Sequence, residues 1–136
     1  MATILIVEDH PEMQKLYYNM LSYDYSILQA YNVREAEEAL EKHDVDLIIL
    51  DMVLPEQDGH TFLLDIRKNE KYRRTPVIVS TVLSRKNQSV RMSEKIGRAI
   101  YFKKPFHPFE FKTAVDSHLQ QSTNKKENLL KYINSD

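Results

Sequence analysis

The stretch DVDLIILDMVLPEQDG, residues 44–59, decides how this sequence of 136 residues is interpreted. Its centre is the wholly apolar run Leu47–Leu50, which is followed directly by Asp51 and then by a loop closed by Pro55 and Gly59. A short run that is apolar on both faces is typical of a parallel strand covered by helices on both sides. A carboxylate at the tip of such a strand needs an explanation, which makes Asp51 the first candidate functional residue.

Short apolar runs alternate with helical patterns along the rest of the chain, at residues 3–7, 25–30, 76–81 and 99–102. This alternation predicts an α/β fold with a five-stranded parallel sheet, doubly wound by right-handed crossovers. Asn32 and Glu35 resemble a capping box. Helices are expected from Pro11, from Asn32, after Gly59, weakly over 84–96, and from near Pro108. The expected inward-facing residues are Met13, Leu16, Tyr17, Met20, Leu21, Ala36, Ala39, Leu40, Leu63, Ile66, Val90, Met92, Ile96, Phe111, Ala114, Val115, His118 and Leu119.

Length and composition indicate one domain over residues 1–120 and a polar tail over 121–136, in which Leu129, Leu130 and Ile133 could form a short extra helix. The net charge of -1 gives no electrostatic reason to expect nucleic acid or a membrane as a direct partner. There is no cysteine, which excludes disulfides and thiolate sites. The N-terminus lacks a signal-peptide pattern and no apolar run could span a membrane, so we expect a cytoplasmic protein.

Charged and polar side chains follow four of the predicted strands, at the point where each strand ends. The carboxyl ends of parallel strands meet at one edge of a doubly wound sheet, where such sheets bind ligands, so these side chains are expected to lie close together. They are Glu8 and Asp9 after the strand at 3–7, Asp51 after 47–50, Thr81 at the end of 76–81, and Lys104 after 99–102.

The chemistry of this set fits a phosphoryl group on a carboxylate. Clustered carboxylates repel one another unless a cation lies between them, and oxygen ligands suit Mg²⁺. Lys104 supplies a charge for phosphate oxygens and Thr81 a hydroxyl donor. Asp51 can act as the nucleophile that forms an acyl phosphate. Taken alone, Asp9 also fits a helix N-cap and Thr81 a structural role.

Four motifs together resemble those of response-regulator receiver domains: ILIVEDH (4–10), DLIILDMVLPEQDG (46–59), PVIVST (76–81) and YFKKPF (101–106). The resemblance covers about residues 3–119 and implies the flavodoxin-like (βα)5 receiver fold. It further implies that Asp51 is the phosphoacceptor. Asp9 resembles the direct Mg²⁺ ligand, Glu8 a ligand acting through water, and Val53 the residue whose backbone carbonyl is the third protein ligand.

The remaining roles follow from the same resemblance. Thr81 and Lys104 match the residues that contact the phosphoryl group, and Thr81 and Tyr101 match the switch pair. The Lys104–Pro105 peptide bond is expected to be cis, a form nearly confined to proline. A phosphorylated protein of this kind would exchange partners through the surface formed by residues 84–96, the strand at 99–102 and the last helix.

Several residues depart from the family pattern. Val82 follows Thr81 where a small residue is usual, and its branched side chain narrows access to the site. Glu94 replaces a commonly apolar residue in the fourth helix. The side chains two positions after Asp51 and after Thr81, Val53 and Leu83, flank the path of the attacking water in this family. Because both are apolar, we expect a slowly hydrolysing phosphoryl group.

The leading interpretation is a stand-alone signalling module, not an enzyme, that accepts phosphate from a histidine kinase or a histidine phosphotransfer protein and acts by protein contact as a monomer or weak homodimer. A second interpretation is an aspartate-nucleophile phosphatase of the haloacid-dehalogenase type. Those enzymes usually carry a second aspartate two residues after the nucleophile, where Val53 lies here. A third is a constitutive interaction module with little or no phosphorylation, for which Val82 is the supporting feature.

Overall fold

The computed structural model of the protein describes residues 1–119 and shows a parallel sheet in the order β2-β1-β3-β4-β5. The chain runs from β1 out to β2 and then returns past β1 to β3, so the topological switch point lies between β1 and β3. The elements are β1 (Thr3–Val7), α1 (Pro11–Leu21), β2 (Ser26–Ala30), α2 (Val33–Lys42), β3 (Leu47–Leu50), α3 (Gly59–Lys68), β4 (Val77–Thr81), α4 (Gln88–Gly97), β5 (Ile100–Lys103) and a C-terminal helix over residues 108–119. The predicted doubly wound fold is confirmed.

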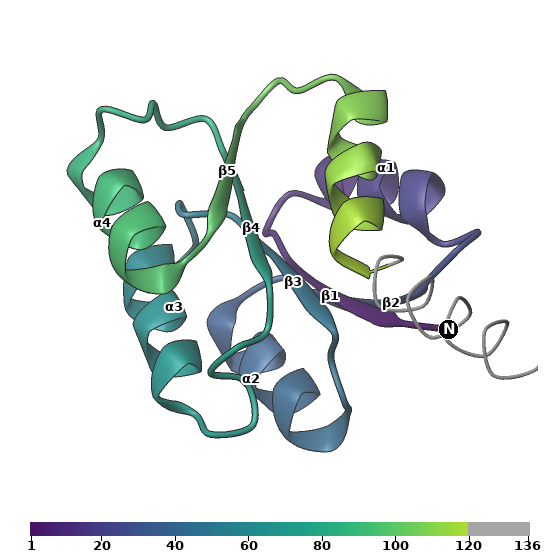
Figure 1. The fold of residues 1–136 in the computed structure, drawn as a ribbon, viewed down its shortest axis with the longest axis horizontal. Coiled ribbons are helices and arrows are strands. Elements are labelled where there is room, and N and C mark those ends of the chain that lie inside the picture. Colours follow the sequence, from purple (N-terminus) through teal and green to yellow (C-terminus); the bar gives the residue numbers. More distant parts are fainter. Residues whose placement is uncertain (120–136) are drawn as a thin grey trace, which may run out of the picture.

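Helices cover both faces of the sheet (Figure 1). Helix α1 and the C-terminal helix lie on one face, while α2, α3 and α4 lie on the other. Each face has its own buried cluster, and strands β1, β3 and β4 contribute alternate residues to the two. The face with α1 is rich in aromatic rings, for example Phe106 stacked on Phe111 with ring centroids 4.4 Å apart. The central strands are therefore apolar on both faces because both faces are buried.

Side chains at the helix starts explain where the helices begin. Pro11 occupies the first turn of α1, where a missing N–H costs nothing. Asn32 accepts a hydrogen bond from the Glu35 N–H at 2.8 Å. Glu35 accepts one in return from the N–H of Tyr31, one residue before the usual capping-box partner. The capping prediction is thus confirmed with a one-residue shift in the reciprocal bond.

Some expected boundaries and burial assignments were wrong. The second, fourth and fifth strands each begin one residue later than predicted, and β5 extends to Lys103. The fourth helix begins at Gln88 rather than 84, because Asn87 caps it through the N–H groups of Ser89 and Val90. Leu16 and Met92 are both 39% exposed instead of buried. Ile96 lies outside the described side chains, and the tail at 121–136 lies outside the described residues.

Candidate functional site

Asp51 lies at the carboxyl end of β3, beside the switch point, and is 5% exposed. The loop after it folds back, so that the Gly59 N–H donates to the carbonyl of Met52 at 3.1 Å. A side chain at position 59 would come within 2.6 Å of the Asp51 carbonyl oxygen, so the start of α3 must be glycine to approach this backbone. The Asp51 carboxylate itself accepts a hydrogen bond from the Val53 N–H at 3.1 Å.

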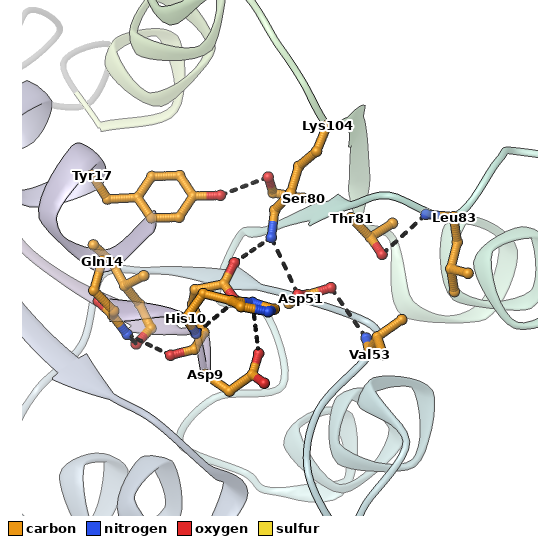
Figure 2. A network of polar contacts seen from close by, with 12 residues as sticks. Asp9, His10, Gln14, Tyr17, Asp51, Val53, Ser80, Thr81, Leu83 and Lys104 are labelled. Atoms are coloured by element: carbon orange, nitrogen blue, oxygen red, sulfur yellow. Dashed lines mark hydrogen bonds and ion pairs between the residues drawn. The ribbon is translucent and has the colours of Figure 1, made fainter. Parts of the chain in front are cut away.

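Lys104 joins the carboxylates of two strands (Figure 2). Its ammonium group contacts Glu8 Oε1 in a short ion pair and lies 3.2 Å from Asp51 Oδ2. Only 10% of the Lys104 side chain is exposed, and the carboxylates are more deeply buried still. The cis peptide bond between Lys104 and Pro105 is present as expected. The structure therefore brings the predicted residues from the ends of β1 and β3 and from beyond β5 into one charged cluster.

The acids of this cluster differ in environment. Burial raises the pKa of the Glu8 carboxyl, and the hydrogen bond from Lys104 opposes this shift. The negative charge of Asp51 raises the same pKa further. Asp9 is more exposed, and its Oδ1 lies 3.1 Å from Nδ1 of His10. The hydrogen bond to Glu8, at 3.1 Å, and the charge of Asp9 raise the pKa of His10. Sequence reasoning did not single out His10, although it directly follows the acidic pair.

The geometry fits a divalent cation. Ligand atoms of Glu8, Asp9, His10 and Asp51 all lie within 4.8 Å of one another. The Asp9 Oδ1 atom is buried and accepts no hydrogen bond within the part of the chain that the structure describes. This oxygen contacts His10 Nδ1 at 3.1 Å but has no hydrogen bond among residues 1–119, and a hard cation that prefers oxygen ligands would satisfy it. Glu8, Asp9 and Asp51 are therefore the residues that could hold Mg²⁺.

Thr81 and Tyr101 are linked by hydrogen bonds to Leu83, which lies in the loop after β4. Thr81 is fully buried, and its Oγ1 accepts a hydrogen bond from the Leu83 N–H at 3.3 Å. The Tyr101 hydroxyl donates a short hydrogen bond to the carbonyl of the same Leu83. Arg85 lies over the Tyr101 ring at 5.1 Å from its centroid and pairs with Glu94 of α4 at 3.2 Å. The two predicted switch residues are thus connected through one backbone unit.

A cavity of about 420 Å³ opens beside Asp51 and Lys104. Val82, which is 63% exposed, and Val53, which is 49% exposed, lie on its rim. Leu83, which we also expected to flank the site, packs instead against the core on the α2–α4 face. The other lining residues are His10, Met13, Leu16, Pro105 and Phe106, which make the rim largely apolar.

Gln14 of α1 is a buried residue of this region that sequence reasoning missed. Its Nε2 lies within hydrogen-bond distance of the carbonyls of Ile6, Glu8 and Ala30, at 3.2, 3.0 and 3.0 Å. Gln14 therefore ties α1 to the ends of β1 and β2. Figure 2 shows its side chain close to the turn that carries Asp9. The available signal was its helical spacing from Tyr17 and Leu21, which places a polar side chain on the buried stripe.

A doubly wound parallel sheet, with carboxylates after its central strands and a lysine after the last, has the architecture of the receiver domains of two-component signalling. The chain belongs to the response regulator receiver domain family, which it matches over residues 4–116. Members of this family are signalling domains rather than enzymes in general, and the family uses Mg²⁺ at an acidic pocket. The described helices include none long and apolar enough to cross a membrane.

Known proteins agree with this assignment. The chain is 33% identical over 132 residues to a probable transcriptional regulator, ycf27, of Cyanidium caldarium, covering 96% of this chain and 51% of the relative. It is 33% identical over 119 residues to histidine kinase P4 of Formosa agariphila, covering 88% of this chain and 9% of the kinase. The chain thus spans about half or less of the length of these relatives.

Solved structures match nearly over their whole length. The chemotaxis protein CheY4 of Vibrio cholerae superposes with a TM-score of 0.78 at 26% identity, covering 88% of this chain and 99% of that one. A two-component response regulator from Clostridium difficile gives a TM-score of 0.81 at 25% identity, covering 90% and 98%. These structures confirm the receiver fold.

Proposed function

We propose that the protein takes a phosphoryl group onto Asp51 from a phosphohistidine of a histidine kinase or histidine phosphotransfer protein. The observation that carries this proposal is the position of Asp51, a nearly buried carboxylate at the switch point with the Lys104 ammonium 3.2 Å away. Buried carboxylates are costly unless they are paired, so a site that keeps three acids and one lysine together is built for a charged group.

The transfer needs positioning rather than elaborate chemistry. A carboxylate oxygen of Asp51 attacks the phosphorus atom, the phosphorus–nitrogen bond breaks, and its electron pair returns to the imidazole of the donor. Lys104 faces the new negative charge, and the Thr81 hydroxyl donates a hydrogen bond to a phosphoryl oxygen. Glu8, Asp9 and Asp51, with the Val53 carbonyl, would hold Mg²⁺, which neutralises phosphoryl oxygens when bound.

The apolar rim of the cavity supports a protein as the phosphate donor. Met13, Leu16, Val53, Val82 and Phe106 surround a charged floor, and a protein surface can cover such a rim and exclude water from the transfer. Phosphorylation would then change the surface of α4, β5 and the C-terminal helix, through which a monomeric or weakly dimeric protein contacts its downstream target. Cytoplasmic location suits a histidine-kinase partner.

Incubation of the protein with acetyl phosphate and Mg²⁺ tests the proposal by intact mass. We expect one added phosphoryl group in the native protein and none in Asp51→Asn. Asp58→Asn is the matched control, since Asp58 is an exposed acid seven residues later whose helix-capping hydrogen bond an asparagine can keep. Undiminished labelling of Asp51→Asn contradicts the assignment. Loss of labelling in Asp58→Asn contradicts it as well.

A further inference from the structure

Four arginines gather at the end of the sheet opposite Asp51. Arg67 comes from the last turn of α3, Arg73 and Arg74 from the segment before β4, and Arg98 from the turn before β5. They line one cavity of about 470 Å³, together with Thr75 and Pro76. Three separate segments of the chain therefore place positively charged side chains around this one cavity.

Three members of this arginine cluster have no acidic partner among residues 1–119. Arg73, Arg74 and Arg98 are exposed, and their side chains make no hydrogen bond or ion pair with residues 1–119. Elsewhere on the surface, arginines such as Arg34 and Arg85 pair with an acid. Within residues 1–119, the positive charges of these three arginines are consequently available to a ligand.

One member of the cluster is held firmly. Nη1 of Arg67 is within hydrogen-bond distance of the carbonyls of Tyr72, Arg73 and Thr75, the last at 2.7 Å. Burial and, after it, the charge of Arg98 lower the pKa of Arg67. Arg98 also has a left-handed backbone, with φ of 53°, which is uncommon for a residue other than glycine or asparagine.

Helix dipoles do not account for the cluster. The C-terminal ends of α3 and α4 lie at this end of the sheet, and basic residues in the last turn of a helix offset its negative pole. Each pole is equivalent to only about half an elementary charge. Two helix ends thus match roughly one of the three charges that have no acidic partner among residues 1–119.

We propose that the arginine cluster binds a compact ligand with two or more linked phosphate groups. Guanidinium groups form bidentate hydrogen bonds with phosphate, and each phosphate brings up to about two negative charges where a carboxylate brings one. Arg73, Arg74 and Arg98 bring three positive charges to the cavity that Arg67 also lines, and such a density of negative charge matches them best. The lining includes no aromatic ring on which a base could stack, so recognition is of the phosphate chain and not of a nucleoside.

Titration with inorganic tripolyphosphate in Mg²⁺-free buffer at physiological salt, followed by amide NMR, tests the proposal. We expect saturable shifts centred on residues 67, 73–75 and 98. Arg74→Gln and Arg98→Asn should each weaken binding at least tenfold, and asparagine tolerates the backbone conformation at position 98. Arg34→Gln is the matched control, an exposed arginine on α2, and should leave binding unchanged.

Titrations with other ligands test which part of a phosphate-containing molecule the arginine cluster recognises. ATP should bind no more tightly than tripolyphosphate, and orthophosphate should bind at least tenfold more weakly. Absence of saturable shifts overturns the proposal, as does equal weakening in Arg34→Gln, which would mean unspecific attraction. A glutamate-rich peptide or a short DNA duplex that binds the cluster more tightly than tripolyphosphate also overturns it, in favour of a macromolecular partner.

Discussion

The hydroxyl of Tyr101 on β5 donates a hydrogen bond to the backbone carbonyl of Leu83, in the loop that follows β4. The N–H of Leu83 in turn donates to Oγ1 of Thr81. Because both bonds end on one residue, a displacement of Thr81 must alter the environment of Tyr101. Arg85 and Glu94 extend the same network from the loop to α4.

The first prediction is that the Thr81 hydroxyl couples phosphorylation to β5. A phosphoryl group adds strong acceptor oxygens, and Thr81 can reach them only by moving toward Asp51 and pulling the Leu83 loop. Beryllofluoride, an acyl-phosphate mimic, should therefore shift amide signals of the native protein over residues 83–106. In Thr81→Ala the shifts should stay near Asp51. Shifts that still reach residues 83–106 without the hydroxyl, or never reach them with it, mean that this coupling is wrong.

The network also shows what the sequence could and could not predict. The doubly wound parallel sheet, its two-sided burial and the meeting of Glu8, Asp51 and Lys104 follow from periodicity and from the geometry of parallel sheets, so they were predictable. The link between Tyr101 and Leu83 depends on side-chain and loop conformation, for which periodicity carries no information. We predicted that Tyr101 is a switch residue, but not which atom it contacts.

Burial of polar residues was the other gap. From the periodicity of the first helix we predicted that Leu16 is buried, and we did not consider Gln14. In the structure Leu16 is 39% exposed and Gln14 is fully buried. A polar side chain occupies this buried position of the helix because its amide donates to backbone carbonyls at the ends of β1 and β2. Leu16 lies instead on the rim beside Asp51, where an exposed apolar side chain suits the proposed protein contact.

The second prediction concerns Asp9. Asp9→Asn should weaken Mg²⁺ binding at least about tenfold, or ~1.4 kcal/mol, since it removes a charged ligand whose Oδ1 has no hydrogen bond. Asp58→Asn should leave the Mg²⁺ affinity unchanged. Without Mg²⁺, Asp9→Asn should raise the free energy of unfolding by up to about 1 kcal/mol, because it relieves repulsion in a partly exposed acid cluster. Calorimetric titration and urea unfolding measure the two effects, and equal Mg²⁺ affinity in Asp9→Asn and native protein would refute the ligand assignment.

The third prediction is a long-lived phosphoryl group. Val53 and Val82 lie on the rim beside Asp51, and neither can orient an attacking water by hydrogen bonding. We expect a lifetime of many minutes after the donor is removed, and Val53→Asn should shorten it by about tenfold, a barrier change of ~1.4 kcal/mol. Leu83→Asn should have less effect on hydrolysis because Leu83 packs against the core. A lifetime of seconds in the native protein contradicts the prediction.

The fourth prediction gives Gln14 a positioning role. Gln14→Leu keeps the volume but removes the amide donor near the carbonyls of Ile6, Glu8 and Ala30, of which Ala30 keeps the N–H of Glu8. Loss of this buried donor should cost about 1–3 kcal/mol of stability. Because the Glu8 carbonyl starts the acidic turn, Mg²⁺ affinity should fall as well. Gln88→Leu, at an exposed position on α4, is the control and should change stability by less than about 0.5 kcal/mol. A destabilised Gln14→Leu protein with native Mg²⁺ affinity would mean that Gln14 is purely structural.

The fifth prediction concerns alkaline pH. The buried hydroxyl of Tyr17 donates to Oγ of Ser80 at 2.6 Å, so Tyr17→Phe should cost about 0.5–1.5 kcal/mol at pH 7. Burial raises the pKa of Tyr17 above its ordinary value, so the phenol stays protonated in the folded protein at a pH where it ionises in the unfolded chain. The folded state then binds more protons, and the native protein loses stability as the pH rises above about 10.

Phenylalanine has no proton to lose, so the stability difference between Tyr17→Phe and native protein should shrink as the pH rises. At one pH unit above the pKa of Tyr17 in the unfolded chain, ionisation of that chain lowers the free energy of unfolding of the native protein by about 1.4 kcal/mol. This loss is enough to cancel the stabilisation by the hydrogen bond that Tyr17→Phe removes. Urea unfolding between pH 7 and 11 measures this difference, with Tyr23→Phe as the control because that side chain is 91% exposed. If the penalty of Tyr17→Phe stays constant up to pH 11 while Tyr23→Phe has none, the Tyr17 phenol ionises equally in both states, and its burial does not control alkaline stability.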